Sequence, residues 1–202
     1  PMRKSKIEPA TTETKISVEV DLDGTGSYDC RTGVGFFDHM LDLMARHGAM
    51  DLTVRAEGDL HIDQHHTVED VGLALGEALA QALGERRGIV RFAHAYAPLD
   101  EALARAVVDL SGRPWPEIHL GLVRPSIGAI ASENITHVFT SLAAALGCAL
   151  HVDVLRGAND HHRAEAAFKA LALALGQALV VDGAEVPSTK GVLGGTSGEV
   201  AP

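Results

Sequence analysis

Hydrophobic and polar residues alternate along the first part of the chain. Over residues 15–23 the apolar side chains occupy every second position, which is typical of a strand with one buried face. The turn-forming sequence Asp23-Gly24-Thr25-Gly26 follows, and it predicts a hairpin whose second strand runs over 28–32. A shorter apolar segment at 52–54 indicates a further strand.

Two helices are predicted in the same part of the chain. Phe37, Met40, Leu41 and Met44 repeat at helical spacing, and Gly48 is a suitable residue to end this helix. The second predicted helix runs from His65 to about Leu83 and is apolar on nearly all sides. A helix of this kind is expected to be buried between other layers.

The second part of the chain repeats this order. Strands are predicted at 91–98, 102–110 and 149–155, and helices at 134–146 and 161–179. We therefore expect an α+β fold made of two internally duplicated ββαβα halves, at about 10–87 and 88–182, with sheets packed on a helical layer. The halves are too small and too alike to be independent domains, so we predict one domain over 1–202 with a C-terminal substrate-binding tail.

Composition narrows the class of protein. The 202 residues carry a formal charge of −10 with only 17 Lys and Arg, which excludes a basic nucleic-acid surface. Cys30 and Cys148 are too few for a disulfide framework and are interpreted as reduced core thiols. No segment resembles a signal peptide or a membrane span. We expect a cytoplasmic protein without a membrane or nucleic-acid partner.

A double histidine with a carboxylate behind it occurs twice. The sequences are His65-His66-Thr67-Val68-Glu69 and His161-His162-Arg163-Ala164-Glu165. On a helix the first histidine and the glutamate are i and i+4, about 5–6 Å apart at Cβ, so both can bind one cation. The second histidine points about 100° away and can serve another cation. Nitrogen and oxygen donors of this kind suit Mn, Fe, Zn or Ni.

Two alternatives apply to this motif. Asp70 stands i+4 from His66 and could act as the carboxylate, although the second copy has Ala166 there. Each motif alone could also be a solvated helix start. The duplication favours a metal site with Glu69 and Glu165.

Several motifs together resemble one enzyme family over nearly the whole chain. They are Phe37-Asp38-His39-Met40-Leu41, His65-His66-Thr67-Val68-Glu69-Asp70, Arg91-Phe92, Pro98-Leu99-Asp100-Glu101, Asp109-Leu110-Ser111-Gly112-Arg113-Pro114, Asp160-His161-His162 and Pro187-Ser188-Thr189-Lys190-Gly191. Their order and spacing resemble the imidazoleglycerol-phosphate dehydratases of histidine biosynthesis.

The resemblance implies two manganese ions per active site, each held by three histidines and one glutamate. The implied ligands are His39, His65, His66, Glu69, His137, His161, His162 and Glu165. Spacing alone indicates six of these, whereas His39 and His137 come from the resemblance and from their equivalent places in the two halves. His151 is interpreted as a structural histidine, and we expect no metal role for His47, His61, His94 or His119.

The implied reaction is the dehydration of imidazole glycerol phosphate to imidazole acetol phosphate. Glu13 matches a substrate contact that could transfer a proton, although a solvated glutamate at a strand edge explains it equally well; Glu69 and Glu165 are the other implied catalytic carboxylates. Arg91 and Arg113 match phosphate contacts, and arginine suits bidentate phosphate recognition. Ser188 and Lys190 of the tail are expected to complete the phosphate pocket.

The resemblance also implies a homo-oligomer, of twenty-four subunits, with metals at subunit contacts. We expect the N-terminal ends of the two histidine helices to face apart, so that each metal shell needs a neighbouring subunit. The rival hypotheses are a histidine-rich metal-storage or assembly protein and a dinuclear metallohydrolase. The first leaves Arg91, Arg113 and Lys190 in their motifs unexplained. The second usually requires metal-bridging aspartates, which the sequence does not identify.

Overall fold

The computed structural model describes residues 2–191 and 193, and it contains two four-stranded sheets and four long helices. The first half contributes β1 (Lys4–Ile7), β2 (Thr14–Asp21), β3 (Tyr28–Arg31), α1 (Gly35–Gly48), β4 (Asp51–Gly58) and α2 (His65–Leu83). The second half contributes β5 (Phe92–Leu99), β6 (Ala102–Asp109), β7 (Trp115–His119), β8 (Ser126–Ile127), β9 (Ile130–Ala131), α3 (Ser132–Leu146), β10 (Ala149–Arg156) and α4 (Asp160–Ala178). The expected α+β fold of two similar halves is confirmed.

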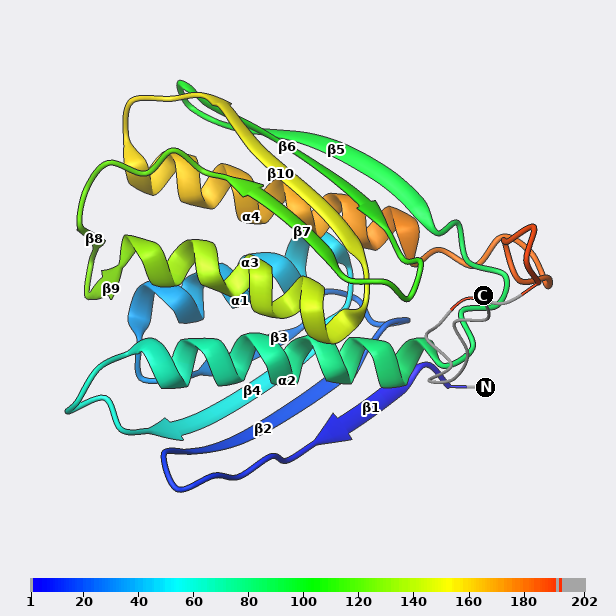
Figure 1. Cartoon of the computed structure of the whole chain (residues 1–202), viewed down its shortest axis with the longest axis horizontal. Helices are drawn as coiled ribbons and strands as arrows, with labels where there is room; N and C mark the ends of the chain where they lie inside the picture. The colour runs from blue at the N-terminus through cyan, green and yellow to red at the C-terminus, as the bar shows by residue number, and fades with distance from the viewer. Residues whose placement is uncertain (1, 192, 194–202) are drawn as a thin grey trace, which may run out of the picture.

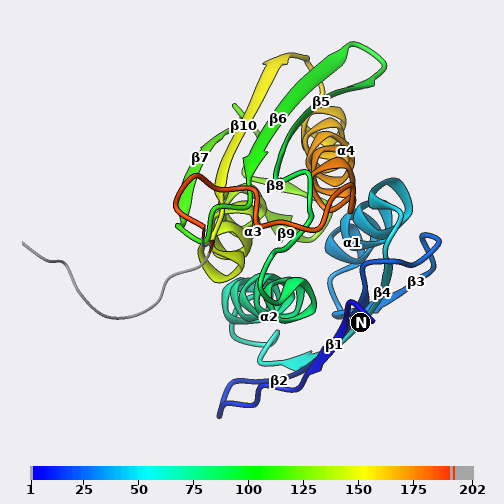
Figure 2. The same ribbon diagram turned by 90° about the vertical axis from the view of Figure 1, so that its right-hand side faces the viewer.

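The helices form a layer between the two sheets (Figures 1 and 2). The sheet orders are β1-β2-β4-β3 and β5-β6-β10-β7, which are the same order once the halves are aligned. The inward side chains of β2 are Ile16, Val18 and Val20, each at most 3% exposed, as the alternation predicts. Both sheets bury one face against the helices, so a continuous apolar core links the halves.

The predicted hairpin is wrong. β2 pairs antiparallel with β4, and β3 pairs parallel with β4, so β2 and β3 are not neighbours. Each four-stranded sheet also has one strand more than expected, because β1 and β7 lie at sheet edges and their short mixed sequences carry little periodicity. In the second half β8 and β9 form a further two-stranded sheet that was not expected. The residue that caps the C-terminus of α1 is Ala49, in the left-handed conformation, and not the expected Gly48, which is the last residue of the helix.

All four helices begin at the same end of the molecule, on the left in Figure 1. The expectation that the histidine helices α2 and α4 face apart is therefore wrong. They still serve separate places, since α2 packs chiefly on α3 and α4 packs on α1. Each of these pairs joins one helix from each half of the chain.

Small residues allow one of these helix pairs to approach closely. A Cβ atom on Gly76 of α2 would lie 2.7 Å from the carbonyl oxygen of Leu142 and 2.7 Å from Cβ of Ala145, both on α3. The helix pair therefore depends on a glycine at this crossing.

Other expectations concern cysteines and membranes. Cys30 and Cys148 are both free and buried, as expected of core thiols. Among the described residues, none of the helices combines the length and hydrophobicity that a bilayer crossing requires.

Candidate metal centre

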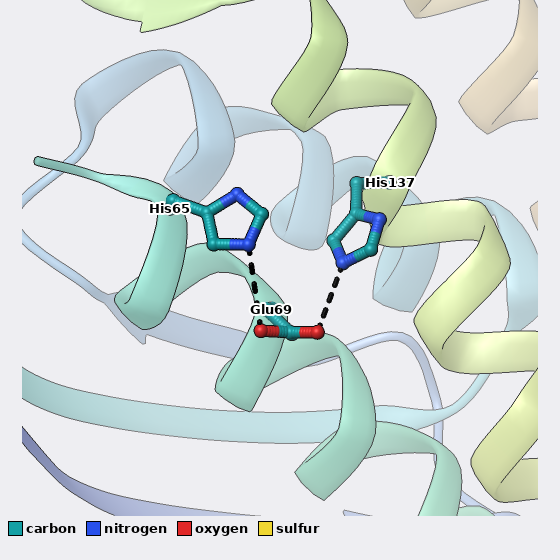
Figure 3. Close-up of side chains that lie close together, drawn as sticks. All are labelled: His65, Glu69 and His137. Atoms are coloured by element: carbon teal, nitrogen blue, oxygen red, sulfur yellow. Dashed lines mark hydrogen bonds and ion pairs between the residues drawn. The ribbon is translucent and has the colours of Figure 1, made fainter.

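The first cluster joins helices from the two halves (Figure 3). Nε2 of His65 lies 3.5 Å from Oε2 of Glu69, one helical turn along α2, and Nε2 of His137 on α3 lies 3.1 Å from Oε1 of the same glutamate. One ligand atom from each residue lies within 4.8 Å of the other two. Three donors therefore converge on a space where one cation could bind.

A second contact orients the ring of His65 through its other nitrogen. Its Nδ1 lies 3.2 Å from the side-chain oxygen of Asn134, a residue of α3 that is only 2% exposed. Because the amide oxygen of Asn134 accepts, this contact favours the tautomer that is protonated at Nδ1. In that tautomer the lone pair of Nε2 is available to a cation placed between His65 and Glu69.

The second cluster uses the other helix pair. Nε2 of His161 on α4 lies 3.1 Å from Oε2 of Glu165, and Nε2 of His39 on α1 lies 3.6 Å from the same oxygen. Nζ of Lys169 lies 3.1 Å from the other oxygen of Glu165. The ring of Phe36 packs edge-on against His161, where the first cluster has its asparagine.

The carboxylate of Glu165 is more buried than that of Glu69, with 12% against 35% of its side chain exposed. Burial opposes its ionisation, but the hydrogen bond and charge of Lys169, together with His161, outweigh burial and lower the pKa of Glu165. The carboxylate therefore stays ionised at neutral pH and can act as an oxygen ligand.

The second histidine of each motif faces away from these clusters. Nδ1 of His66 lies 2.8 Å from Oδ2 of Asp59, and Nδ1 of His162 lies 2.7 Å from Oε2 of Glu101. The hydrogen bond from His162 and those from two backbone N–H groups lower the pKa of Glu101 to about 2. Reasoning from the sequence missed both carboxylates, because loops rather than helical spacing bring them to the histidines.

Glu13 lies at the same end of the molecule. Its Oε2 is 3.5 Å from Nδ1 of His66, and half of its side chain is exposed. The expected substrate contact is thus beside a predicted ligand.

The clusters fit a divalent metal ion. Imidazole nitrogen with carboxylate oxygen is a donor set for Mn, Fe, Zn or Ni, and no thiolate is nearby, since both cysteines are buried elsewhere. Among the described residues, His65, Glu69 and His137 form the set whose three ligand atoms all lie within 4.8 Å of one another. In the second cluster His39 and His161 share one oxygen of Glu165, and Lys169 binds the other. His66 and His162 lie outside both clusters. His151 lies exposed on β10, on the face of the second sheet that points away from the helices and from both clusters.

The predicted phosphate residues lie at the opposite end of the molecule. The backbone N–H of Arg91 donates to the carbonyl of Ala178, the last residue of α4, whereas Glu165 lies near the start of that helix. Thirteen residues separate these points, which is about 20 Å along a helix. One chain therefore cannot present both groups to a small substrate.

The cations at this end differ in their availability. The guanidinium of Arg91 binds both oxygens of Asp109, at 2.7 and 3.2 Å, and donates to the carbonyl of Pro187. It therefore holds the tail in this structure. Arg113 and Lys190 are exposed, and the backbone N–H of Lys190 donates to Oγ of Ser188.

Comparison with known proteins gives a consistent result. The family model "Imidazoleglycerol-phosphate dehydratase" matches residues 32–175. A curated protein of that name from Dinoroseobacter shibae is 55% identical over 195 residues, which cover 95% of this chain and 100% of that protein. Another, from Zymomonas mobilis, is 51% identical over 95% of this chain and 99% of that protein.

Solved structures agree with the sequence comparison. The imidazoleglycerol-phosphate dehydratase of Staphylococcus aureus superposes with a TM-score of 0.80 at 33% identity, covering 88% of this chain and 99% of that one. The enzyme from Pyrococcus furiosus gives 0.79 at 35% identity, covering 93% and 100%. The motifs, the duplicated fold and these matches agree, and this chain belongs to the imidazoleglycerol-phosphate dehydratase family.

Proposed function

We propose that this chain dehydrates imidazole glycerol phosphate to imidazole acetol phosphate in a manganese-dependent reaction, with two metal ions at each active site. Family membership makes the chain a hydro-lyase of histidine biosynthesis. The manganese, its number and the roles of individual residues are our proposal. The observation that carries it is the convergence of His65, Glu69 and His137 within 4.8 Å.

The chemistry explains why such a cluster is useful. The hydrogen to be removed is on a carbon without an adjacent carbonyl, so the imidazole ring must supply electrons to expel the hydroxyl. When bound, divalent metal ions would hold the ring as imidazolate and favour this electron flow. His65, Glu69 and His137 would hold one ion, and His39, His161 and Glu165 the other.

Glu13 is the residue that we propose moves the proton. Its carboxylate is exposed and lies 3.5 Å from His66, so a substrate bound at the clusters would be within reach. A carboxylate in this place can take the proton from the carbon next to the one that loses the hydroxyl. The resulting enol then becomes the ketone.

The phosphate-binding residues support a shared active site. Arg113, Ser188 and Lys190 are proposed to bind the phosphate, and Arg91 to bind it as well or to hold the tail that does so. Because Arg91 lies about 20 Å from the second cluster of its own chain, we infer that each site needs a neighbouring chain. We therefore propose a homo-oligomer with active sites at subunit contacts.

A metal assay tests the proposal directly. The metal-free protein should not convert imidazole glycerol phosphate. Added Mn²⁺ should restore ketone formation. Added Mg²⁺ should not restore it, because Mg²⁺ is a poorer match for imidazole ligands. Full turnover by rigorously metal-free chain would refute the manganese dependence. A metal-storage protein would bind the ion but would leave the substrate unchanged.

A further inference from the structure

The two halves place a glutamate at the same position but use it differently. Glu13 immediately precedes β2, and Glu101 immediately precedes β6, the equivalent strand. The neighbouring glycines confirm the alignment: a Cβ on Gly58 would meet Thr67, and one on Gly157 would meet Arg163. These two contacted residues each follow the second histidine of their motif.

In the second half, Glu101 is fully engaged by its own chain. Its Oε2 lies 2.7 Å from Nδ1 of His162, and its Oε1 accepts the backbone N–H groups of Ala158 and Asn159 at 3.0 and 2.8 Å. Asn159 in turn caps α4 by accepting the N–H of His161 at 2.9 Å. This glutamate thus fixes both the loop and the histidine ring.

In the first half another residue takes over this contact. Asp59 follows Gly58, where the second half has Ala158 after its glycine, and its Oδ2 lies 2.8 Å from Nδ1 of His66. Glu13 is left 3.5 Å from the same nitrogen, beyond the usual hydrogen-bond range.

The backbone around Glu13 is held without its carboxylate. Oγ1 of Thr11 accepts the N–H groups of Glu13 and Thr14, and Oγ1 of Thr14 donates to Asp70 at 2.5 Å. The second half has Ala102 and Ala166 at the positions of Thr14 and Asp70. The unduplicated Asp70 therefore anchors the strand end that carries Glu13.

We propose that Asp59 and Glu101 are positioning residues that hold His66 and His162 through Nδ1, and that Asp59 replaces Glu13 in this role so that the Glu13 carboxylate remains free for the substrate. An ionised carboxylate only accepts, so the proton stays on Nδ1 and Nε2 keeps the lone pair that a metal ion needs. This inference rests on the proposed metal-dependent function.

The test measures the affinity of the intact protein for Mn²⁺, with electron paramagnetic resonance as the readout of bound and free ion. Glu101→Gln should weaken binding by about 10–100-fold, the usual effect of removing an outer-shell partner. The amide oxygen can still accept the two backbone N–H groups, whereas its NH₂ group would face Nδ1 and favour the wrong tautomer. Glu117→Gln is the matched control, because Glu117 binds Nε2 of His119 at 2.6 Å on the outer sheet.

The first half allows a sharper test of the replacement. In Asp59→Ala we expect Glu13 to move onto His66, as Glu101 binds His162, so that Mn²⁺ affinity changes by only a few-fold while kcat falls by more than about 10-fold because the proposed proton acceptor is occupied. In Asp59→Ala with Glu13→Gln, affinity should fall as far as in Glu101→Gln. The spectrum of bound Mn²⁺ should change in the double variant and stay close to that of the parent in Asp59→Ala.

The outcomes separate the two proposals. Unaltered protein that binds no Mn²⁺ would overturn the metal-dependent function and this inference with it. Normal binding by the unaltered protein and by Glu101→Gln would overturn the positioning role alone. If the loss of Mn²⁺ affinity in the double variant equals the sum of the losses in Asp59→Ala and in Glu13→Gln alone, the replacement of Glu13 by Asp59 is refuted.

Discussion

At the scale of single residues, three of the four histidines of the two motifs are held by a hydrogen bond to Nδ1, whereas the fourth, His161, packs against Phe36. Asn134 holds His65, Asp59 holds His66 and Glu101 holds His162, each through Nδ1. Fixing one nitrogen sets both the ring orientation and the tautomer. The donors are therefore preorganised before any ion binds.

Removing one such donor gives the first prediction. His65→Ala should lower turnover by more than about 100-fold, because losing a direct ligand costs more than the 10–100-fold typical of its supporting partners. The side chain is 44% exposed, so the free energy of unfolding should change by only about 0.5 kcal/mol. Steady-state kinetics at saturating Mn²⁺ and denaturant unfolding measure both. His151→Ala is the control, and near-normal turnover of His65→Ala would contradict the ligand assignment.

A second residue-scale prediction concerns pH and stability. Oδ1 of Asp51 accepts the N–H groups of Thr25, Gly26 and Ser27 at 2.8, 3.1 and 2.9 Å and so closes the loop before β3. The hydrogen bonds from Ser27 and Thr25 lower the pKa of Asp51, although partial burial opposes this. A lowered folded-state pKa adds stability above the unfolded value of about 3.9, and this stability is lost as pH falls through the folded pKa.

Asp51→Ala should therefore destabilise the fold by about 1–2 kcal/mol at neutral pH, and the difference should shrink toward zero as the pH falls below about 4. Urea unfolding at several pH values measures it. Asp51→Asn is the matched control, because its amide oxygen still accepts hydrogen bonds but does not titrate in this range. A destabilisation by Asp51→Ala that is independent of pH would show that the carboxylate charge does not contribute.

At the scale of elements, each metal cluster depends on how closely two helices from different halves approach. Gly76 permits the contact of α2 with α3 that places His137 beside Glu69. Gly76→Ala would push Cβ into the backbone of α3, and backbone atoms cannot rotate away. We expect a loss of about 1–3 kcal/mol in stability from overpacking, together with weaker Mn²⁺ binding.

A matched glycine distinguishes packing from helix propensity. Gly35, at the start of α1, has no atom within 4 Å of an added Cβ, so Gly35→Ala should be neutral or stabilising by up to about 1 kcal/mol. Denaturant unfolding and Mn²⁺ titration of both variants give the comparison. If Gly76→Ala binds Mn²⁺ as tightly as the unaltered protein, the helix spacing does not control the cluster.

The elements also show what a sequence can and cannot predict here. Alternation at 15–23 and the helical spacing after His65 predicted β2 and α2 correctly, because each pattern reports a face that is buried locally. The turn at 23–26 indicated a change of direction, but the partner of β3 is β4, which comes later in the chain. Pairing between distant segments leaves no local periodicity.

The candidate site divides in the same way. The i, i+4 spacing correctly predicted that His65 approaches Glu69, because both residues lie on one helix. The ligand role of His137 was expected from family resemblance, but its approach to Glu69 from the other half was not predicted, since helix pairing decides it. Loop geometry decides the carboxylate partners Asp59 and Glu101. Glu101 belongs to a family motif, but that motif did not indicate its contact with His162.

At the scale of the whole molecule, the metal clusters and the phosphate residues lie at opposite ends of the helices, about 20 Å apart for Glu165 and Arg91. If the site is shared between chains, a variant that lacks a metal ligand and a variant that lacks a phosphate-binding residue should therefore complement one another. His65→Ala and Arg113→Glu should each be nearly inactive alone. When they are co-expressed with two tags and purified as mixed particles, some sites should combine an intact cluster with an intact Arg113.

Random mixing in a symmetric oligomer predicts recovery of up to about a quarter of the unaltered activity. Kinetics on mixed particles measure this, and a mixture of the separately purified variants, assayed without subunit exchange, is the control. Mixed particles that are no more active than the single variants would show that each site is built within one chain.

The outer face of the second sheet offers a surface for such an assembly. Phe92, Val107 and Trp115 are 58%, 40% and 64% exposed, and they lie on the side of the sheet that faces away from the helices. Large exposed apolar side chains on one face are typical of a protein contact. Apolar burial and metal binding could both hold the subunits together, and removal of the metal separates the two contributions.

The last prediction is that metal removal dissociates the proposed homo-oligomer. The first cluster brings three donors of one chain within 4.8 Å, and the second brings His39 and His161 to Glu165. His66 and His162 use Nδ1 for their own chain's carboxylates, so we expect Nε2 of such a histidine from a neighbour to complete a metal shell. An ion that binds only the assembled state stabilises it by mass action. Exhaustive chelation should therefore shift the mass measured by light scattering to smaller species, and Mn²⁺ at neutral pH should restore it. Chelator saturated with Mn²⁺ is the control, and a particle of unchanged mass after complete metal loss would show that apolar contacts alone hold the subunits together.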